Sequence, residues 1–139
     1  MTKLGHLLAS IGVVALLAAQ LSCEESVYHP DEIQIERTFR SIANGITESD
    51  LTKQLGEPTG RIVFDPARGT FQYSVTTNPT LVQEFRTLDE VKDSPHSELR
   101  FLRVSARGNT ILVFVKGTVY GYFYFGEAGH LEDKVVVVS

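Results

Sequence analysis

Residues 118–125, TVYGYFYF, decide the fold that the sequence predicts. Side chains of a β-strand alternate between two faces with a period of two residues. One face of this stretch is free of polar side chains: Val119, Gly121, Phe123 and Phe125. The other face carries three tyrosines: Tyr120, Tyr122 and Tyr124. What covers each face therefore determines the core of the protein and the surface left for binding.

Segments with the same alternation flank this stretch and predict an antiparallel sheet. They comprise residues 99–105, 110–115 and 131–138, with short glycine-bearing breaks between them. Short breaks join antiparallel neighbours, so these strands are expected to form a β-meander. Upstream, residues 61–64 and 71–75 alternate around a turn and predict a hairpin. Residues 77–97 fit either a helix or a further strand followed by a polar loop.

Two helices are predicted before the first hairpin. Pro30 with two acidic residues begins the first, and Ile35, Phe39 and Ile42 form its apolar stripe. Thr47 begins the second as an N-cap, with Leu51 and Leu55 as its apolar positions.

The predicted fold class is therefore α+β. Two N-terminal helices pack on one face of an antiparallel β-meander of five to six strands. The apolar face of residues 118–125 is expected to meet the two helix stripes.

The first residues have the pattern of an export signal rather than of a domain. Lys3 precedes an apolar run over residues 7–19, which is short for a membrane span of roughly 20 residues. We expect residues 1–22 to be a signal peptide, residues 23–30 a tether and residues 31–139 the folded domain. A buried N-terminal helix is the alternative for the first segment.

Cys23 is the only cysteine and follows the signal directly. Because one cysteine cannot form an internal disulfide, it needs another explanation. Its position resembles the acylated cysteine of bacterial lipoproteins, although Gln20 departs from their cleavage pattern. That resemblance implies attachment to a membrane through Cys23, on the periplasmic face of the outer membrane. A soluble periplasmic or secreted protein is the alternative.

The charge balance argues against nucleic acid as a partner. Without residues 1–22 the chain has 12 basic and 17 acidic residues, a net charge of −5. A surface that binds phosphates through lysine and arginine is not expected from this balance.

Residues 45–60, GITESDLTKQLGEPTG, carry a resemblance to a known family. The order Gly45-Ile46-Thr47, Leu51 and Leu55-Gly56-Glu57-Pro58 is similar to small bacterial outer-membrane lipoproteins of the BamE (SmpA/OmlA) type. Their superfamily includes the β-lactamase inhibitory protein repeat. The resemblance implies two helices on one face of a small antiparallel sheet and a role in envelope assembly. The additional strands in this chain depart from the family's compact sheet.

The tyrosine face is the candidate binding surface. Tyrosine suits a wet interface because its ring buries apolar area while its hydroxyl keeps a polar partner. We expect Tyr120, Tyr122 and Tyr124, together with Phe114 of the preceding strand, to contact a protein partner in the cell envelope. The alternative is that another part of the chain, such as residues 80–90, covers this face.

No metal, cofactor or catalytic centre is predicted. His130, Glu132 and Asp133 lie close in sequence and His96 lies in a polar stretch, but four-ligand zinc spacing is absent. The sequence contains neither G-x-S-x-G nor a glycine-rich phosphate loop. Four arginines, Arg86, Arg100, Arg103 and Arg107, are interpreted as a solvated face, with an anionic partner as the alternative.

These observations together predict a non-enzymatic, membrane-anchored periplasmic binding or scaffold lipoprotein in envelope assembly. The alternative is an inhibitor or immunity-type protein that blocks a periplasmic enzyme or toxin.

Overall fold

The structure, a computed structural model, describes residues 30–103 and 109–139, without the side chains of Pro30 and Leu88. The chain divides within its first described helix into two compact units, Met1–Gln34 and Ile35–Ser139. The sheet and its core belong to the second unit. The predicted signal peptide, the lipidation site Cys23 and Arg107 lie outside the described residues.

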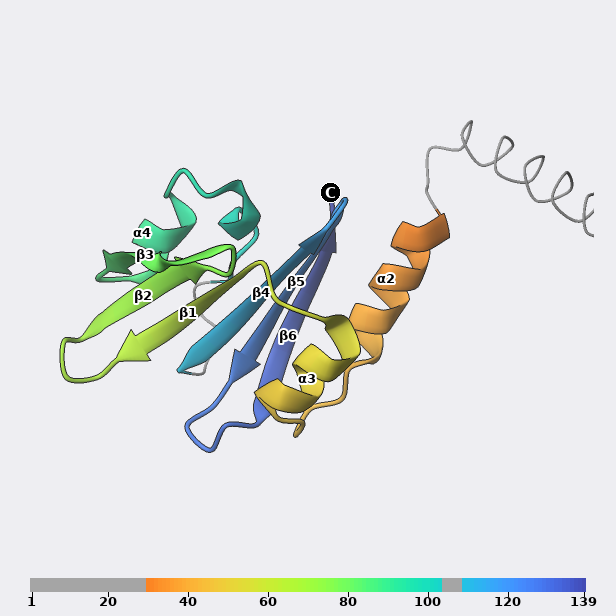
Figure 1. Cartoon of the computed structure of the whole chain (residues 1–139), viewed down its shortest axis with the longest axis horizontal. Helices are drawn as coiled ribbons and strands as arrows, with labels where there is room; N and C mark the ends of the chain where they lie inside the picture. The colour runs from red at the N-terminus through yellow and green to blue at the C-terminus, as the bar shows by residue number, and fades with distance from the viewer. Residues whose placement is uncertain (1–29, 104–108) are drawn as a thin grey trace, which may run out of the picture. The chain divides into compact units, whose positions relative to one another are not determined.

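The protein is α+β, with six antiparallel strands in one sheet (Figure 1). The strands are β1 (Gly60–Asp65), β2 (Thr70–Val75), β3 (Asn78–Phe85), β4 (Thr110–Lys116), β5 (Val119–Phe125) and β6 (Leu131–Val138). Their order across the sheet is β3-β2-β1-β4-β5-β6. The prediction of one continuous meander was wrong, because two three-strand meanders meet where β1 pairs with β4. β3 and β6 are therefore the two edge strands.

The two predicted N-terminal helices are confirmed as α2 (Pro30–Ser41) and α3 (Glu48–Leu55). Thr47 is the N-cap of α3, since its Oγ1 accepts a hydrogen bond of 3.2 Å from the Asp50 backbone N–H. After α2 the chain joins the start of β6, where the Leu131 N–H donates to the Ile46 carbonyl at 2.8 Å. These contacts fix the turn between the two helices against the sheet.

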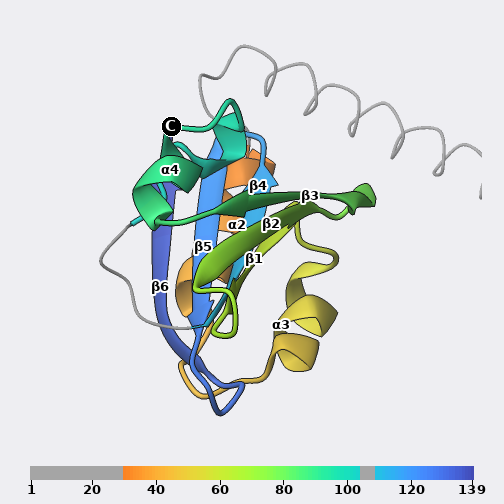
Figure 2. The ribbon, with the colours of Figure 1, turned by 90° about the vertical axis from the view of Figure 1, so that its left-hand side faces the viewer.

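The helices cover one face of the β4–β6 half of the sheet (Figures 1 and 2). Phe39 of α2 packs edge to face on Phe114 and Phe123, with ring centroids 6.1 and 5.8 Å apart. The buried residues of this helix-side core are Phe39, Ile42, Leu51, Leu55, Leu112, Phe114, Val119, Phe123, Phe125 and Leu131. The predicted contact between the apolar face of residues 118–125 and the helix stripes is confirmed.

A second core lies on the opposite face of the sheet. Its buried residues are Ile62, Tyr73, Val91, Leu99, Leu102, Ile111, Val113, Tyr122 and Tyr124. The residues that cover it come from the chain between β3 and β4, which forms α4 (Leu88–Lys92) and the 3₁₀ turn η1 (Ser97–Leu99). We call residues 86–103 the covering segment.

The strand predicted over residues 99–105 is not present where the structure describes these residues, which are 99–103. Leu99 and Leu102 are both buried, and their spacing of three residues matches a 3₁₀ turn rather than a strand. Within residues 30–103 and 109–139, no helix is both long enough and apolar enough to span a membrane.

Candidate functional site

The structure places most of the predicted tyrosine surface in the second core. Tyr122 and Tyr124 are completely buried beneath the covering segment, and Tyr120 is half-buried. The ring of Tyr120 packs edge to face on Phe101, with centroids 4.9 Å apart. The prediction of an exposed tyrosine patch is therefore wrong. These side chains pack within the chain, as in the alternative named above, and residues 86–103 cover them.

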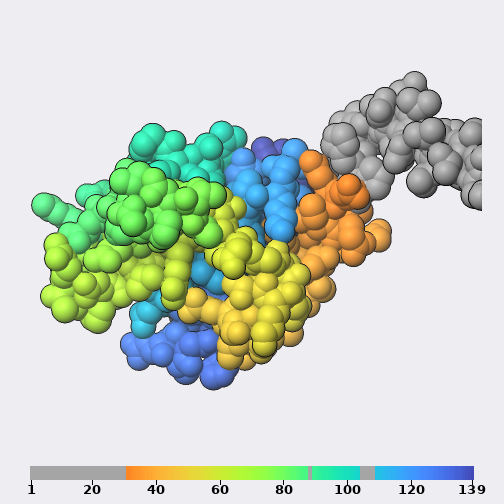
Figure 3. Space-filling view, viewed as in Figure 1, coloured from red at the N-terminus to blue at the C-terminus, as the bar shows by residue number. Residues whose placement is uncertain are grey.

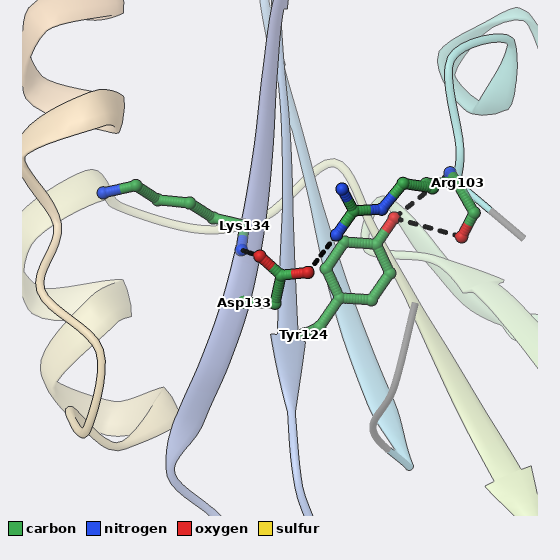
Figure 4. A network of polar contacts seen from close by, with 4 residues as sticks. All are labelled: Arg103, Tyr124, Asp133 and Lys134. Carbon is green, nitrogen blue, oxygen red and sulfur yellow. Dashed lines mark hydrogen bonds and ion pairs between the residues drawn. The ribbon is translucent and has the colours of Figure 1, made fainter. Parts of the chain in front are cut away.

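Two tyrosine hydroxyls hold the covering segment by its backbone. Tyr122 donates to the Glu98 carbonyl at 2.7 Å and accepts from the Phe101 N–H at 3.3 Å. The Tyr124 hydroxyl accepts from the Arg103 N–H at 3.2 Å (Figure 4). The polar ends of both rings are thus used within the chain, where they satisfy backbone groups that β-strand pairing leaves unpaired.

Phe114 does not share a face with the tyrosines. It pairs directly with Gly121, and residues directly opposite on antiparallel strands point to the same side. Phe114 therefore lies in the helix-side core, fully buried against Phe39 and Phe123. Its predicted role in partner binding is corrected to a core role. The signal that could have placed it is the two-residue turn at Gly117 and Thr118, which sets this register.

Adjacent residues of β6 connect the sheet to elements on its two sides (Figure 4). Asp133 forms an ion pair with Arg103 at the end of the covering segment. Lys134 points the other way, and its Nζ donates to the carbonyls of Arg40 and Ile42 at the end of α2. Burial and the nearby Arg40 charge lower the pKa of Lys134. Arg103 is therefore part of the fold rather than of an open cationic face.

Alkaline pH is expected to destabilise the protein through Tyr124. Burial is the main cause that raises the Tyr124 pKa from 10.0 to about 12. Because the folded state holds this proton more tightly, the stabilisation is complete below pH 10 and is lost between about pH 10 and 12. Urea unfolding across this range should show a smaller pH dependence in Tyr124→Phe than in the unchanged chain. An equal pH dependence in both would contradict a buried, neutral Tyr124.

The histidines and acids considered as metal ligands do not form a cluster. In the described part of the chain, no group of three His, Cys, Asp or Glu side chains has the geometry for a metal ion. His130 is exposed at the end of the β5–β6 turn and forms an isolated bridge with Thr47. His96 instead contacts Glu98 and Gln83, at 3.3 and 2.7 Å.

The strand alternative for residues 77–97 is correct for residues 78–85, which form β3, but its position at an exposed sheet edge was not predicted. Seven of the eight residues of β3 are exposed. Leu81 is 66% exposed and Val82 is 52% exposed, the two largest values among the large hydrophobic side chains that the structure describes. In Figure 3 the green surface of the β2–β3 region borders the yellow surface of α3 and is open on this face of the molecule. The sequence signal was the run Thr80-Leu81-Val82, which fitted a strand as well as a helix.

A small pocket, here called the β3 pocket, lies on the covering-segment side of this strand. Its lining residues are Tyr73, Val75, Asn78, Leu81, Gln83 and His96. Its volume is about 210 Å³. Sites for drug-sized ligands have roughly 300–1,000 Å³, so this volume fits one large side chain better than a complete small molecule. Apolar groups of Val75 and Leu81 and the Tyr73 ring adjoin the polar ends of Gln83 and His96.

Contacts within the chain hold the side chains that form the inner wall of the β3 pocket. His96 hydrogen-bonds Gln83 of β3 and packs edge to face on Tyr73 of β2, with ring centroids 5.0 Å apart. Among the described residues, the buried Tyr73 hydroxyl has no hydrogen-bond partner. Burial and the nearby Glu98 carboxylate raise the pKa of Tyr73, so it remains neutral. The His96 ring therefore connects the two strands that line the pocket, through Gln83 of β3 and Tyr73 of β2.

The opposite edge strand, β6, carries the features that discourage further strand pairing. Charged side chains interrupt it at Glu132, Asp133 and Lys134, and charges on an edge oppose the addition of another strand. The Arg40 guanidinium also donates to the Val136 carbonyl at 3.3 Å. β3, with the sequence NPTLVQEF, carries one charged side chain, Glu84, which is paired with Arg68, and has Pro79 near its start. β3 is thus the edge with fewer charged side chains and with the more exposed apolar ones.

Comparison of the chain with protein-family models, with curated proteins and with solved structures found no match.

Proposed function

We propose that this protein is a non-enzymatic binding or scaffold module of the bacterial cell envelope that holds a protein partner at the β3 edge. A lipid on Cys23 anchors it to the outer membrane on the periplasmic side, and its role is in envelope assembly. The single observation that carries the binding role is the exposure of Leu81 and Val82 on an edge strand.

The physical support for this role is the difference between the two edges. An open edge strand presents unpaired backbone groups, which makes it a template for another chain and an aggregation risk. Exposed large apolar side chains on such a strand add to the risk. A partner that covers β3 would remove this exposure, whereas β6 is already guarded by charges and by contacts with α2.

The anchor is supported by the sequence pattern at residues 1–23 and has its own test. Cells that express the full chain would be labelled with a clickable fatty acid. Label is expected on the unchanged chain and absent from Cys23→Ala. Label that persists in Cys23→Ala would contradict acylation at this residue.

The binding role is tested by photo-cross-linking in the intact envelope. A photoreactive amino acid replaces Val82 in one full-length variant and Val138 of β6, which is 39% exposed, in a control variant. A discrete cross-linked partner is expected from position 82 and not from position 138. Equal cross-linking at both positions, or none at position 82, would contradict a partner at the β3 edge.

The identity of the cross-linked protein separates two roles. Components of β-barrel assembly would support a scaffold role in the envelope. A single hydrolase or toxin would instead support the inhibitor or immunity role and overturn the assembly role.

A further inference from the structure

We propose that the protein at the β3 edge is a second copy of this chain. The two β3 strands pair antiparallel about a two-fold axis and join the two six-strand sheets into one sheet. This inference rests on the proposed binding function and names the partner at that edge.

The two edges of the sheet favour a second copy over a single added strand. An isolated strand that pairs with β3 becomes an edge strand itself and presents unpaired backbone groups. A second copy leaves no new edge at the contact, because the joined sheet ends in β6 on both sides. The charged side chains of β6, which are Glu132, Asp133 and Lys134, oppose the addition of a further strand. The assembly therefore closes at two copies, as an isologous interface does.

The register of the contact follows from the part of β3 that pairs regularly with β2. Residues from Val82 to Phe85 pair one by one with β2, whereas the register shifts before Val82. This shift and Pro79, which lacks an N–H group, discourage strand pairing of the first half of β3. Leu81 faces the same side as Gln83, because both line the β3 pocket. A two-fold axis at Gln83 therefore pairs residues 81–85 of one copy with residues 81–85 of the other.

This register makes the β3 edge self-complementary. On the side of the covering segment, Leu81 of each copy lies opposite Phe85 of the other, and directly opposite residues of antiparallel strands point to the same side. Leu81 is 66% exposed and Phe85 is half-buried, so the contact covers apolar surface of both side chains in each copy. On the other side of the sheet, Val82 of each copy lies opposite Glu84 of the other.

No like charges lie directly opposite each other in the two paired β3 strands. Glu84 is the only charged residue of β3, and it pairs with Arg68 of its own copy at 3.0 Å. Because the axis passes through Gln83, the two Glu84 side chains do not face each other. α4 follows the end of β3, so antiparallel pairing places the two α4 helices beyond opposite ends of the contact.

Cysteines on β3 locate the two-fold axis in the intact envelope. The test uses full-length chains in cells, because anchoring both copies to one membrane raises their effective concentration. Gln83→Cys is expected to give a disulfide-linked dimer on a non-reducing gel, since directly opposite residues have Cα atoms about 4.5–5.5 Å apart. Val82→Cys should give far less dimer, because the two Val82 positions are diagonal neighbours about 7–8 Å apart. Val138→Cys on β6 is the control and should give none.

A charge at position 82 tests direct contact between the two copies. Val82→Lys places a lysine opposite Glu84 of the other copy, whereas Val82→Glu places like charges opposite each other. Both variants introduce a charge at the same exposed position, so both should fold as the unchanged chain does, which circular dichroism checks. In sedimentation of the purified full-length protein, the dimer dissociation constant should be about tenfold lower for Val82→Lys than for Val82→Glu, because the pair occurs twice.

Several results would each overturn the proposal. They are a disulfide-linked dimer at position 138, its absence at position 83, and a yield at position 82 as large as that at position 83. Equal dissociation constants for the two Val82 variants, or a lower one for Val82→Glu, would also overturn it.

The two proposals fail separately. Absence of a cross-link from the photoreactive residue at position 82 removes the binding function itself. A discrete cross-link from position 82 to a different protein, without a disulfide-linked dimer of Gln83→Cys, removes only the second copy.

Discussion

Replacing Phe123 by alanine is expected to lower the free energy of unfolding by about 3–5 kcal/mol. Phe123 is completely buried and packs edge to face on Phe39 and Phe114, with centroids 5.8 and 5.5 Å apart. Its removal leaves a cavity between α2 and the sheet and deletes both aromatic contacts. Urea unfolding followed by circular dichroism measures the loss.

The control for Phe123→Ala is Leu81→Ala at the exposed edge. Leu81 is 66% exposed, so this change should remain within about 0.5 kcal/mol of the unchanged chain. Similar losses for the two variants would contradict the burial that the fold assigns to Phe123.

A methyl group at position 121 is expected to destabilise the protein by about 1–3 kcal/mol through overpacking. A Cβ on Gly121 would lie 2.7 Å from Cδ2 of Phe39 and 2.9 Å from Cε1 of Phe123. Neither ring can move freely, because both lie in the helix-side core. Gly121→Ala therefore tests how closely α2 approaches β5.

A double-mutant cycle separates this contact from a general effect of alanine in the strand. Phe39→Val removes the δ and ε ring atoms, which lie nearest to position 121. The cost of Gly121→Ala should therefore be smaller in the Phe39→Val background than in the unchanged chain. Equal costs in both backgrounds would show that the ring of Phe39 is not the obstacle.

Local patterns predicted the helix side of the fold well. The cap at Thr47, the stripe of Ile35, Phe39 and Ile42, and the two-residue period at residues 118–125 each depend on neighbours in sequence. Each therefore specifies its element without knowledge of the rest of the chain. The helix-side core follows, because it joins the apolar faces that these patterns define.

The cover of the tyrosine face could not be predicted in the same way. Tyr122 and Tyr124 are buried by residues far away in sequence, and their hydroxyls contact the backbone of Glu98 and Arg103 rather than a recognisable partner side chain. Leu99, Phe101 and Arg103 alternate like a strand, whereas tertiary packing selects the spacing of Leu99 and Leu102. Pattern alone cannot decide between these two periods in so short a segment.

The candidate site in the structure, the β3 edge, differs from the predicted site on β5 for a related reason. Aromatic residues suggested an interface on β5, but β5 lies inside the sheet, where both faces are covered. Which strand is an edge depends on strand order, and the order here departs from the sequence at β1 and β4. The exposure of Leu81 and Val82 indicates a binding surface only once β3 is known to be an edge strand.

The strand order also has a consequence for how the chain folds. Within each meander, neighbouring strands are also neighbours in sequence, so β1–β3 and β4–β6 can form through short loops. Pairing of β1 with β4, as between Gly60 and Val113, must close a much longer loop that contains α4 and η1. Closing that loop costs conformational entropy before the new strand pairing adds any stability. Pairings between residues distant in sequence therefore slow folding. Joining the two meanders at β1 and β4 is therefore expected to be the rate-limiting step, and the tyrosine contacts with residues 98–103 form together with it.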